Sequence, residues 1–205
     1  MSLTNPLGDV EISDPRAMRA LAHPVRMAIL TFLQRHGPAT ATSLAPVVGA
    51  SPSVTSWHLR HLATFGLVEN CDVGTDARRR WWRAVGRGFR FSLPDGEEGS
   101  AAYSMLAGQL FESSLRQAQT WQSEVEPELD DDWRRLSGTA NTRVTVSRDE
   151  LEHIEDEIEK LIAPYVTRGP AEVPPSARSA RLLRVYMPAA VEEATSDDDG
   201  GQGER

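Results

Sequence analysis

The sequence predicts a mainly α-helical protein in which a small helical domain closes with a β-hairpin and continues into a helical or α+β part. Three observations lead to this prediction. Apolar residues recur at helical spacing in short segments up to residue 64. Beyond Gly66, runs rich in Val and Trp flank a turn-prone stretch, as in a hairpin. The net charge then reverses, from +5 over residues 1–93 to −13 over residues 94–205.

Two helices are expected near the N-terminus, after a disordered leader at residues 1–12. Residues 13–15 read Ser-Asp-Pro, the composition of a helix cap and first turn, so we expect a helix through Ala22. A second helix follows a His-Pro pair and extends to about His36. The Gly-Pro pair after His36 ends it.

A tight turn and a further helix are expected next. Residues 42–48 form a short apolar segment, which ends at Gly49. Ser51 can cap a helix over residues 52–64, because its first residue, Pro52, lacks only an amide that would be unbonded anyway. Helix, tight turn and helix together are the arrangement of a helix-turn-helix unit.

The helix over residues 52–64 has two different faces at 3.6 residues per turn. The inner face, which suits a core, carries Thr55, Leu59 and Leu62, with His58 at its edge. The outer face carries Ser53, Ser56, Trp57 and Arg60. Hydrogen-bonding side chains, an aromatic ring and a guanidinium suit base edges and phosphates, so this face predicts a helix that enters a DNA groove.

A β-hairpin is expected after this helix, with strands at residues 67–73 and 79–85 around the turn at 74–78. Trp81 and Trp82 alternate across the second strand, so one should be buried and the other partly exposed. A hairpin directly after such a helix is a wing.

The C-terminal region, residues 100–187, is expected to follow a linker at residues 94–99. Its predicted elements are a long helix over 101–125, a strand at 142–146, a helix from Ser147 to about Val166 and a strand at 180–186. Residues 189–205 are acidic and lack material for a core, so we expect a disordered tail.

Five sequence elements occur in a characteristic order: His23-Pro-x-Arg26-x-x-Ile29-Leu30, Leu44-Ala45, Ser51-x-Ser53-x-x-Ser56-x-His58-Leu59-x-x-Leu62, Gly66-Leu67-Val68 and the Arg-rich wing. Over residues 13–92 the chain thereby resembles winged helix-turn-helix regulators of the arsenic-repressor (ArsR) type. The resemblance implies a DNA-binding domain at residues 13–93 in a homodimeric, sequence-specific transcription factor, usually a repressor released by a metal or another signal. Two departures matter: residues 42–48 lack the Cys-x-Cys pair of metal-sensing relatives, and the chain continues for about as many residues again.

The candidate DNA contacts are Ser51, Ser53, Ser56, Trp57, His58 and Arg60 of the helix, and Arg78, Arg79 and Arg80 of the wing tip. The helix would enter the major groove, while the wing would lie along the backbone or in the minor groove. Trp57 packs either against a thymine methyl or sugar, or back on the wing. The alternatives are a winged-helix module that binds protein without binding DNA, and a wing that serves only solubility.

An apolar stripe on the long helix is the candidate dimer interface: Tyr103, Leu106, Leu110, Phe111, Leu115, Ala118 and Trp121. Intrachain core and a ligand pocket are its other readings. We favour dimerisation, because one recognition helix reads few base pairs, whereas a two-fold dimer places two of them about 34 Å apart, one DNA turn.

Other candidate sites are weaker. His58 and His61 could be metal ligands, but His58 more often hydrogen-bonds within this motif or to phosphate, and His61 has no spaced partner. Glu150, His153 and Glu157 share a helix face, but a solvated acidic face explains that pattern better. Cys71 is either a redox sensor or, as is commoner, inert. We therefore expect no metal and no cofactor, and leave a small-molecule effector open.

Composition excludes several classes of function. The sequence contains no apolar run of the length that crosses a bilayer and no secretion signal, and its single cysteine cannot form an internal disulfide, so a cytoplasmic protein is expected. A phosphate loop, a nucleophile elbow and a clustered Cys/His site are missing from the sequence, so an enzyme is not expected. The expected partners are double-stranded DNA and a second copy of the chain.

Overall fold

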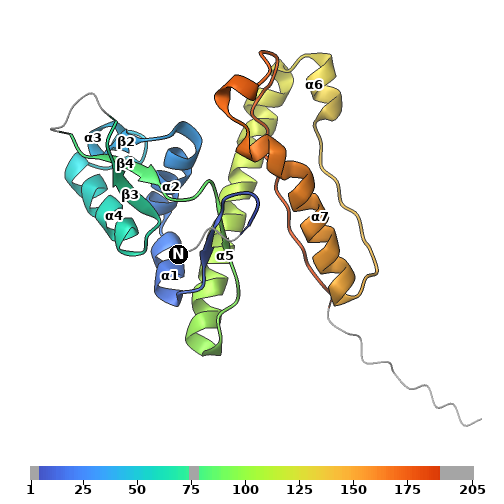
Figure 1. Ribbon diagram of the computed structural model, residues 1–205, viewed down its shortest axis with the longest axis horizontal. Coiled ribbons are helices and arrows are strands. Elements are labelled where there is room, and N and C mark those ends of the chain that lie inside the picture. The colour runs from blue at the N-terminus through green and yellow to red at the C-terminus, as the bar shows by residue number, and fades with distance from the viewer. Residues whose placement is uncertain (1–4, 74–78, 190–205) are drawn as a thin grey trace, which may run out of the picture. The chain divides into compact units, whose positions relative to one another are not determined.

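The computed structural model describes residues 5–73 and 79–189, in which the chain forms a winged helix-turn-helix domain, a long helix and a helical C-terminal region (Figure 1). The helices are α1 (Pro15–Leu21), α2 (Pro24–His36), α3 (Ala41–Leu44), α4 (Pro52–Thr64), α5 (Gly96–Thr120), α6 (Asp131–Leu136) and α7 (Arg148–Thr167). The strands are β1 (Val10–Ile12), β2 (Ala39–Thr40), β3 (Val68–Cys71), β4 (Trp81–Ala84) and β5 (Phe89–Phe91). The chain divides into two units after Pro174, and the described part of the second, residues 175–189, contains neither helix nor strand.

Side-chain caps start the helices α1, α2 and α4. Asp14, His23 and Ser51 each accept a hydrogen bond from a backbone amide two or three residues further on, at 2.8, 3.2 and 3.3 Å respectively. A proline follows each cap, where its missing amide costs nothing. The helix starts predicted at Asp14 and Ser51 are therefore confirmed, and the ring of His23 caps α2 in the same way.

The turn between α3 and α4 depends on a glycine. Gly49 has φ +63°, the left-handed region in which a Cβ is unfavourable. The short α3 begins with a reciprocal capping box between Thr40 and Ser43. Helix α3 packs against α4, so the predicted helix-turn-helix is confirmed.

The wing belongs to a three-stranded antiparallel sheet in the order β2-β4-β3. On the central strand, Trp82 is buried and Trp81 is half-buried, as the alternation predicts. Strand β2 was not predicted, because two residues are too few to show a period.

The prediction of a disordered leader is wrong for residues 5–12. Strand β1 pairs in parallel with β5, and Leu7, Val10 and Ile12 are buried. A Cβ at Gly86 would lie 2.6 Å from a methyl of Val10, so the loop before β5 approaches β1 as closely as a glycine permits. A strand of three residues whose partner lies far along the chain leaves too weak a local signal to predict.

The core of the winged domain runs from β1 to the first turns of α5. Helix α1 packs along α5, and α2 contacts both α4 and β4 (Figure 1). The fully buried side chains come from β1, from all four helices α1–α4, from the residue before β3 and from α5, among them Ile12, Met18, Leu21, Ile29, Leu30, Leu44, Leu59, Leu62, Leu67 and Leu106. This core fixes the inner face of α4.

Helix α5 begins earlier than the expected linker allows. It starts at Gly96, directly after Asp95, and Gly99 is already buried. A Cβ at Gly99 would lie 2.8 Å from that of Pro94, so the glycine lets the helix begin close to the preceding loop. The helical course continues through a π-helical turn, η1 (Trp121–Val125), and a 3-10 turn, η2 (Glu126–Glu128). It ends at Leu129 and Asp130, which are extended, and the unpredicted α6 follows.

Residues 142–146 and 180–186 do not form the predicted strands. Alternating apolar residues produce a strand only where a neighbouring strand accepts their backbone hydrogen bonds, and no described strand pairs with either segment. The helix predicted from Ser147 is confirmed as α7, which opens on a capping box with Glu150. The C-terminal region is therefore helical in the described residues, and the tail expected at 189–205 lies outside them beyond residue 189.

Polar contacts tie α7 to the loop and strand that precede α5. Arg90 of β5 forms an ion pair with Glu159, which is buried. Arg87 donates a hydrogen bond to the backbone carbonyl of Val166. These two arginines lie in the basic half of the chain, so each half supplies one side of the contact.

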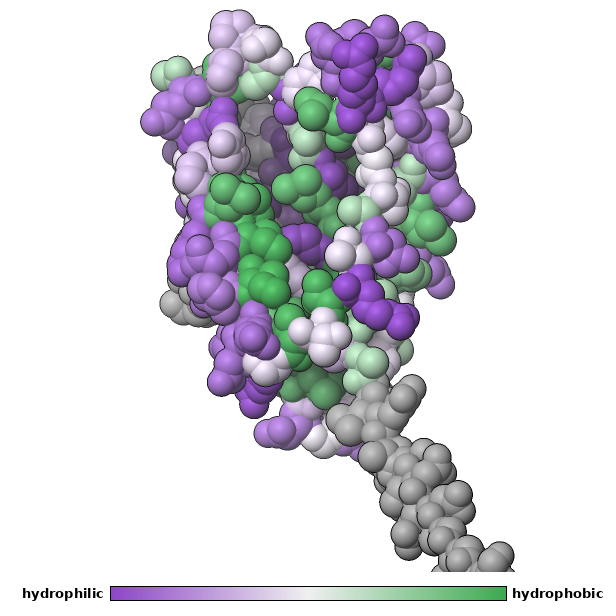
Figure 2. Space-filling view, turned by 90° about the vertical axis from the view of Figure 1, so that its right-hand side faces the viewer, coloured by the Kyte–Doolittle hydropathy of each residue, from purple (hydrophilic) through white to green (hydrophobic). Residues whose placement is uncertain are grey.

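Large apolar side chains stay exposed in the C-terminal region, including Leu136, Val144, Leu161, Tyr165, Leu182 and Leu183. Figure 2 shows one face of the molecule on which hydrophobic side chains, in green, run in a strip between hydrophilic ones. Within the described residues, no helix combines the length and apolar character that crossing a bilayer requires.

Candidate nucleic-acid interface

The outward face of α4 presents a row of polar and aromatic side chains. Ser53, Trp57 and Arg60 are exposed, and Ser56 is half-buried between them. The guanidinium of Arg60 donates a 3.3 Å hydrogen bond to Ser56 Oγ, one helical turn away. The structure thus brings these four predicted residues together on one surface.

The inner face of α4 holds this row in place. Thr55, Leu59 and Leu62 are fully buried, as predicted for a core face. Thr55 Oγ1 also donates a 2.9 Å hydrogen bond to the carbonyl of Ser51, which closes the first turn. Ser51 is exposed at the start of the helix, and its Oγ lies 3.0 Å from that of Ser53, so capping already engages this candidate contact.

His58 is a core residue, so its prediction as a DNA contact is wrong. Its side chain is 5% exposed, and its ring centroid lies 4.9 Å from those of His23 and Trp57. Its Nδ1 atom is buried without a hydrogen-bond partner. Burial, His23 and Arg26 all lower the pKa of His58, which favours a neutral ring. Position 58 lies at the border of the two faces of α4, and the side chain of His58 is buried with the inner face.

A buried guanidinium, that of Arg26, lies close to the contact between His23 and His58. Arg26 of α2 is buried and donates hydrogen bonds to the backbone carbonyls of Ala20 and Arg19. Burial lowers the pKa of Arg26 and also that of the nearby His23. The motif residues His23 and Arg26 therefore fix the junction of α1, α2 and α4 and are not themselves candidate DNA contacts.

The described part of the wing carries arginines at positions 79, 80 and 83. Arg79 and Arg80 are exposed, and Arg78 lies outside the described residues. Arg83 pairs across the hairpin with Glu69 at 2.7 Å, so its charge is already balanced.

The predicted dimer stripe divides between two faces of α5. Leu106 is fully buried, and Tyr103 and Leu110 pack on the same core, so these three line the chain's own interior and the interface prediction is wrong for Leu106. Phe111 and Leu115 are 59% and 51% exposed. Leu115 follows Leu106 by nine residues, about two and a half turns, and so lies on the opposite side of the helix. Ala118 and Trp121 are exposed further along the helix.

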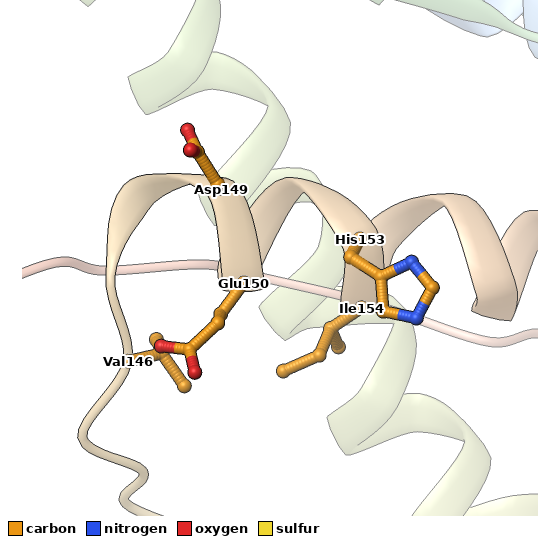
Figure 3. Close-up of a pocket in the computed structure, with 5 residues that line it drawn as sticks. All are labelled: Val146, Asp149, Glu150, His153 and Ile154. Atoms are coloured by element: carbon orange, nitrogen blue, oxygen red, sulfur yellow. The ribbon is translucent and has the colours of Figure 1, made fainter.

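The acidic start of α7 forms an open hollow with no convergent chemistry. Val146, Asp149, Glu150, His153 and Ile154 line it (Figure 3). Figure 3 shows Asp149 pointing away from Glu150, and the His153 ring turned away from both. Glu150 accepts the amide of Ser147 in the capping box, which lowers its pKa. Glu150 is thus committed to the helix start, and a solvated face explains this group.

The remaining candidates are the Cys71 thiol and the side chains that could bind a metal ion. Cys71 is half-buried on β3, and burial raises the pKa of its thiol, which disfavours the reactive thiolate. Within residues 5–73 and 79–189, no group of three His, Cys, Asp or Glu side chains is arranged to hold a metal ion.

One feature of the site was not foreseen from the sequence. The Trp57 ring stacks on that of His61, with centroids 5.5 Å apart and planes 11° apart, and His61 in turn meets Phe65 edge-on at 5.4 Å. Positions 57, 61 and 65 are four apart, so their spacing alone places them on one side of the helix. The spacing of four residues could therefore have predicted these ring contacts.

Comparison with known proteins supports the fold of this region. A family model described as a helix-turn-helix domain matches residues 21–70, the stretch that contains α2, α3 and α4. No curated protein matches the chain.

Several solved structures are similar to the chain. One is the homodimeric winged helix-turn-helix DNA-binding domain Mb0332 from Mycobacterium bovis, a possible ArsR-family transcriptional regulator, with 24% identity, 48% of this chain and 76% of that chain covered, and a TM-score of 0.32. A transcriptional regulator homologue from Pyrococcus horikoshii has 22% identity, 48% and 89% coverage and a TM-score of 0.31. NMB1585, a MarR family regulator from Neisseria meningitidis, has 22% identity, 70% and 80% coverage and a TM-score of 0.30.

Proposed function

We propose that this protein is a sequence-specific DNA-binding transcriptional regulator of the ArsR type that acts as a homodimer and represses its targets. The observation that carries the proposal is the outward face of α4, where Ser53, Ser56, Trp57 and Arg60 stand together on a helix whose opposite face is locked in the core. Repression is the direction that the ArsR-type resemblance implies.

The chemistry of this face suits the major groove of DNA. The groove is wide enough to admit one α-helix, and its base edges present hydrogen-bond acceptors, donors and thymine methyl groups. Arg60 can donate to guanine or to phosphate, and the serine hydroxyls can donate or accept. The fixed inner face matters because a recognition helix specifies sequence only if its orientation is determined by the rest of the domain.

The wing supports the same proposal. Arg79 and Arg80 are exposed at the start of β4, on the element that follows the recognition helix in the chain. In a winged domain this position meets the phosphate backbone or the minor groove next to the major-groove contact. The net charge of +5 over residues 1–93 favours approach to DNA, whereas the −13 of the remainder favours a position away from the duplex.

The second face of α5 supports a homodimer. Phe111 and Leu115 present an apolar surface one turn apart, and Ala118 continues it along the helix. Two-fold pairing through this surface would repeat each recognition helix and wing, and so would double the number of base pairs that are read.

A protein-binding winged helix is the competing function, and one observation favours it. Val47 and Val54, at 50% and 45% exposure, lie in the turn before α4 and in its first turn, and Trp57 follows in the next turn. Apolar side chains on this surface also suit a protein partner. The dependence of binding on salt separates the two functions, because arginine–phosphate contacts release counterions and weaken steeply as salt rises.

The test is selection of duplexes from a random library by the full-length protein, followed by affinity measurements at several salt concentrations. We expect one enriched sequence with two related half-sites and a steep loss of affinity with salt. Arg60→Ala should lower affinity for the selected duplex by about 1–3 kcal/mol. The matched control is Arg35→Ala, because Arg35 is an exposed arginine at the end of α2. Failure to enrich any sequence, or equal losses in the two variants, would contradict the proposal.

A further inference from the structure

Trp57 is held in one orientation on the surface of α4, although about half of its side chain is exposed. His61 stacks on its face with nearly parallel planes, and the buried His58 meets it edge-on at 4.9 Å and 74°. The Trp57 ring therefore has contacts on two sides, both from its own helix. A tryptophan fixed in this way offers a rigid apolar surface that loses little conformational entropy when it binds.

The fixed ring belongs to an apolar strip beside the polar row. On a helix, positions 54, 57 and 61 are neighbours at spacings of three and four, so Val54, Trp57 and His61 adjoin one another. Val54 is 45% exposed and Trp57 52% exposed. Ser53, Ser56 and Arg60 occupy the adjacent positions around the helix. The outward face of α4 thus has a polar side and an apolar side.

The two sides match the two kinds of feature on base edges in the major groove. Hydrogen-bonding side chains pair with acceptors and donors, whereas the apolar feature in that groove is the C5-methyl group of thymine. An apolar ring on the recognition helix contributes to sequence discrimination only where it meets such a methyl group.

We propose that Trp57 is a specificity-determining residue that contacts the C5-methyl group of a thymine in each half-site, and that His61 is the positioning residue that holds its ring. The inference rests on the proposed function, because it requires α4 to lie in the major groove. Without the His61 ring, Trp57 would be free to take other side-chain rotamers, and part of the binding free energy would be spent on ordering it.

Deoxyuridine provides the direct test, because it lacks only the C5-methyl group of thymidine and keeps the same pairing and hydrogen-bonding edges. Each thymine of the selected duplex is replaced singly by deoxyuridine, and the affinity of the full-length protein is measured. We expect one thymine position per half-site at which the replacement weakens binding about fourfold, the effect of burying one methyl-sized group, and about fifteenfold when both half-sites are changed.

Variants separate the ring from its support. Trp57→Ala should bind the thymine and uracil duplexes with equal affinity. His61→Ala should reduce the thymine preference, and His61→Phe should restore it, because a phenyl ring keeps the stack without the imidazole. The control is Arg60→Ala, which should weaken binding to both duplexes and leave their ratio unchanged, since Arg60 lies on the polar side.

The outcomes distinguish this inference from the function on which it rests. If selection yields a specific duplex but no deoxyuridine replacement weakens wild-type binding, Trp57 does not read a methyl group, while the DNA-binding function stands. If the preference survives in Trp57→Ala, another residue reads the methyl group, and the inference is also overturned. If His61→Ala keeps the full preference, the positioning role of His61 is wrong. If selection yields no specific duplex, the proposed function itself fails.

Discussion

The winged domain and the C-terminal region of this chain bury their apolar side chains to very different degrees. The core of the first is continuous from β1 to the start of α5. Of the described residues beyond Ser114, by contrast, Glu159 alone is buried, and it is a charged residue that pairs with Arg90. The first region stabilises itself, whereas the second exposes apolar surface that a monomer leaves uncovered.

The division falls within a single helix, which is what makes it informative. The first half of α5 completes the core of the winged domain through Ala102 and Leu106. From Phe111 onward the same helix turns an apolar face to solvent. Helix α5 therefore belongs to the winged domain at one end and to the proposed dimer at the other, and any rearrangement of that dimer would be transmitted to α1, which packs along α5.

The largest expected effect is on assembly. Phe111→Asp and Leu115→Asp should each weaken self-association at least about a hundredfold, because an unpaired carboxylate would be buried in an apolar contact. Sedimentation velocity over a range of concentrations measures this. The control is Leu136→Asp, since Leu136 is 81% exposed and belongs to α6. A dimer unaffected by both substitutions on α5 would place the interface elsewhere.

The next effect sharpens the difference in burial. Leu59→Ala should lower the free energy of unfolding by about 2–5 kcal/mol, since Leu59 is fully buried on the inner face of α4. Leu161→Ala removes the same atoms from a side chain that is 70% exposed, and should change that free energy by less than about 0.5 kcal/mol. Urea unfolding followed by circular dichroism compares them. Comparable losses would show that Leu161 is covered in the assembled protein.

A smaller effect is expected where the two regions meet through charge. Arg90→Ala leaves the carboxylate of Glu159 buried without its cation, a cost of about 1–3 kcal/mol that water reduces, because Arg90 is 43% exposed. Hydrogen exchange should then accelerate in α7 while α4 stays protected. Adding Glu159→Gln should recover part of the protection. The control is Arg116→Ala, because Arg116 pairs with an equally exposed Glu112. Unchanged exchange in α7 would show that the ion pair does not hold it.

Local signals in the sequence were sufficient for α1, α2, α4 and α7 and for most of the outward face of α4, but not for α6 or for the start of α5. A cap, a proline and apolar residues at helical spacing identify α4, and the same rules assign Ser53, Ser56, Trp57 and Arg60 to its outward face. His58 was misassigned because periodicity leaves a border residue undecided, and packing against His23 decided it.

Features that depend on distant parts of the chain could not be predicted in the same way. Sequence periodicity predicts the stripe on α5 as one face, and only the packing of the winged domain shows that Leu106 is buried in its core while Leu115 stays exposed. Strand β1 exists because β5 pairs with it, and residues 142–146 are not a strand because nothing described pairs with them. In each case the deciding contact lies many residues away, so local periodicity carries no information about it.

The smallest expected effect concerns pH and tests how rigidly the winged domain holds the buried His58 and the half-buried His23. Burial lowers the pKa of His58 and His23 in the folded protein, and the facing charges of Arg26 and His61 add to this. The unfolded chain therefore binds protons more readily than the folded one below the ordinary histidine pKa of about 6.5. Stability should be constant above that value and fall as pH decreases below it, because the folded state favours the neutral rings of the buried His58 and the half-buried His23. Carboxylates titrate lower, so urea unfolding at pH 7.5 and 5.5 isolates the histidines, and His58→Gln should show a shallower loss than the wild type. A wild-type stability that is flat over this range, or an identical slope in the variant, would mean that His58 becomes solvated without cost.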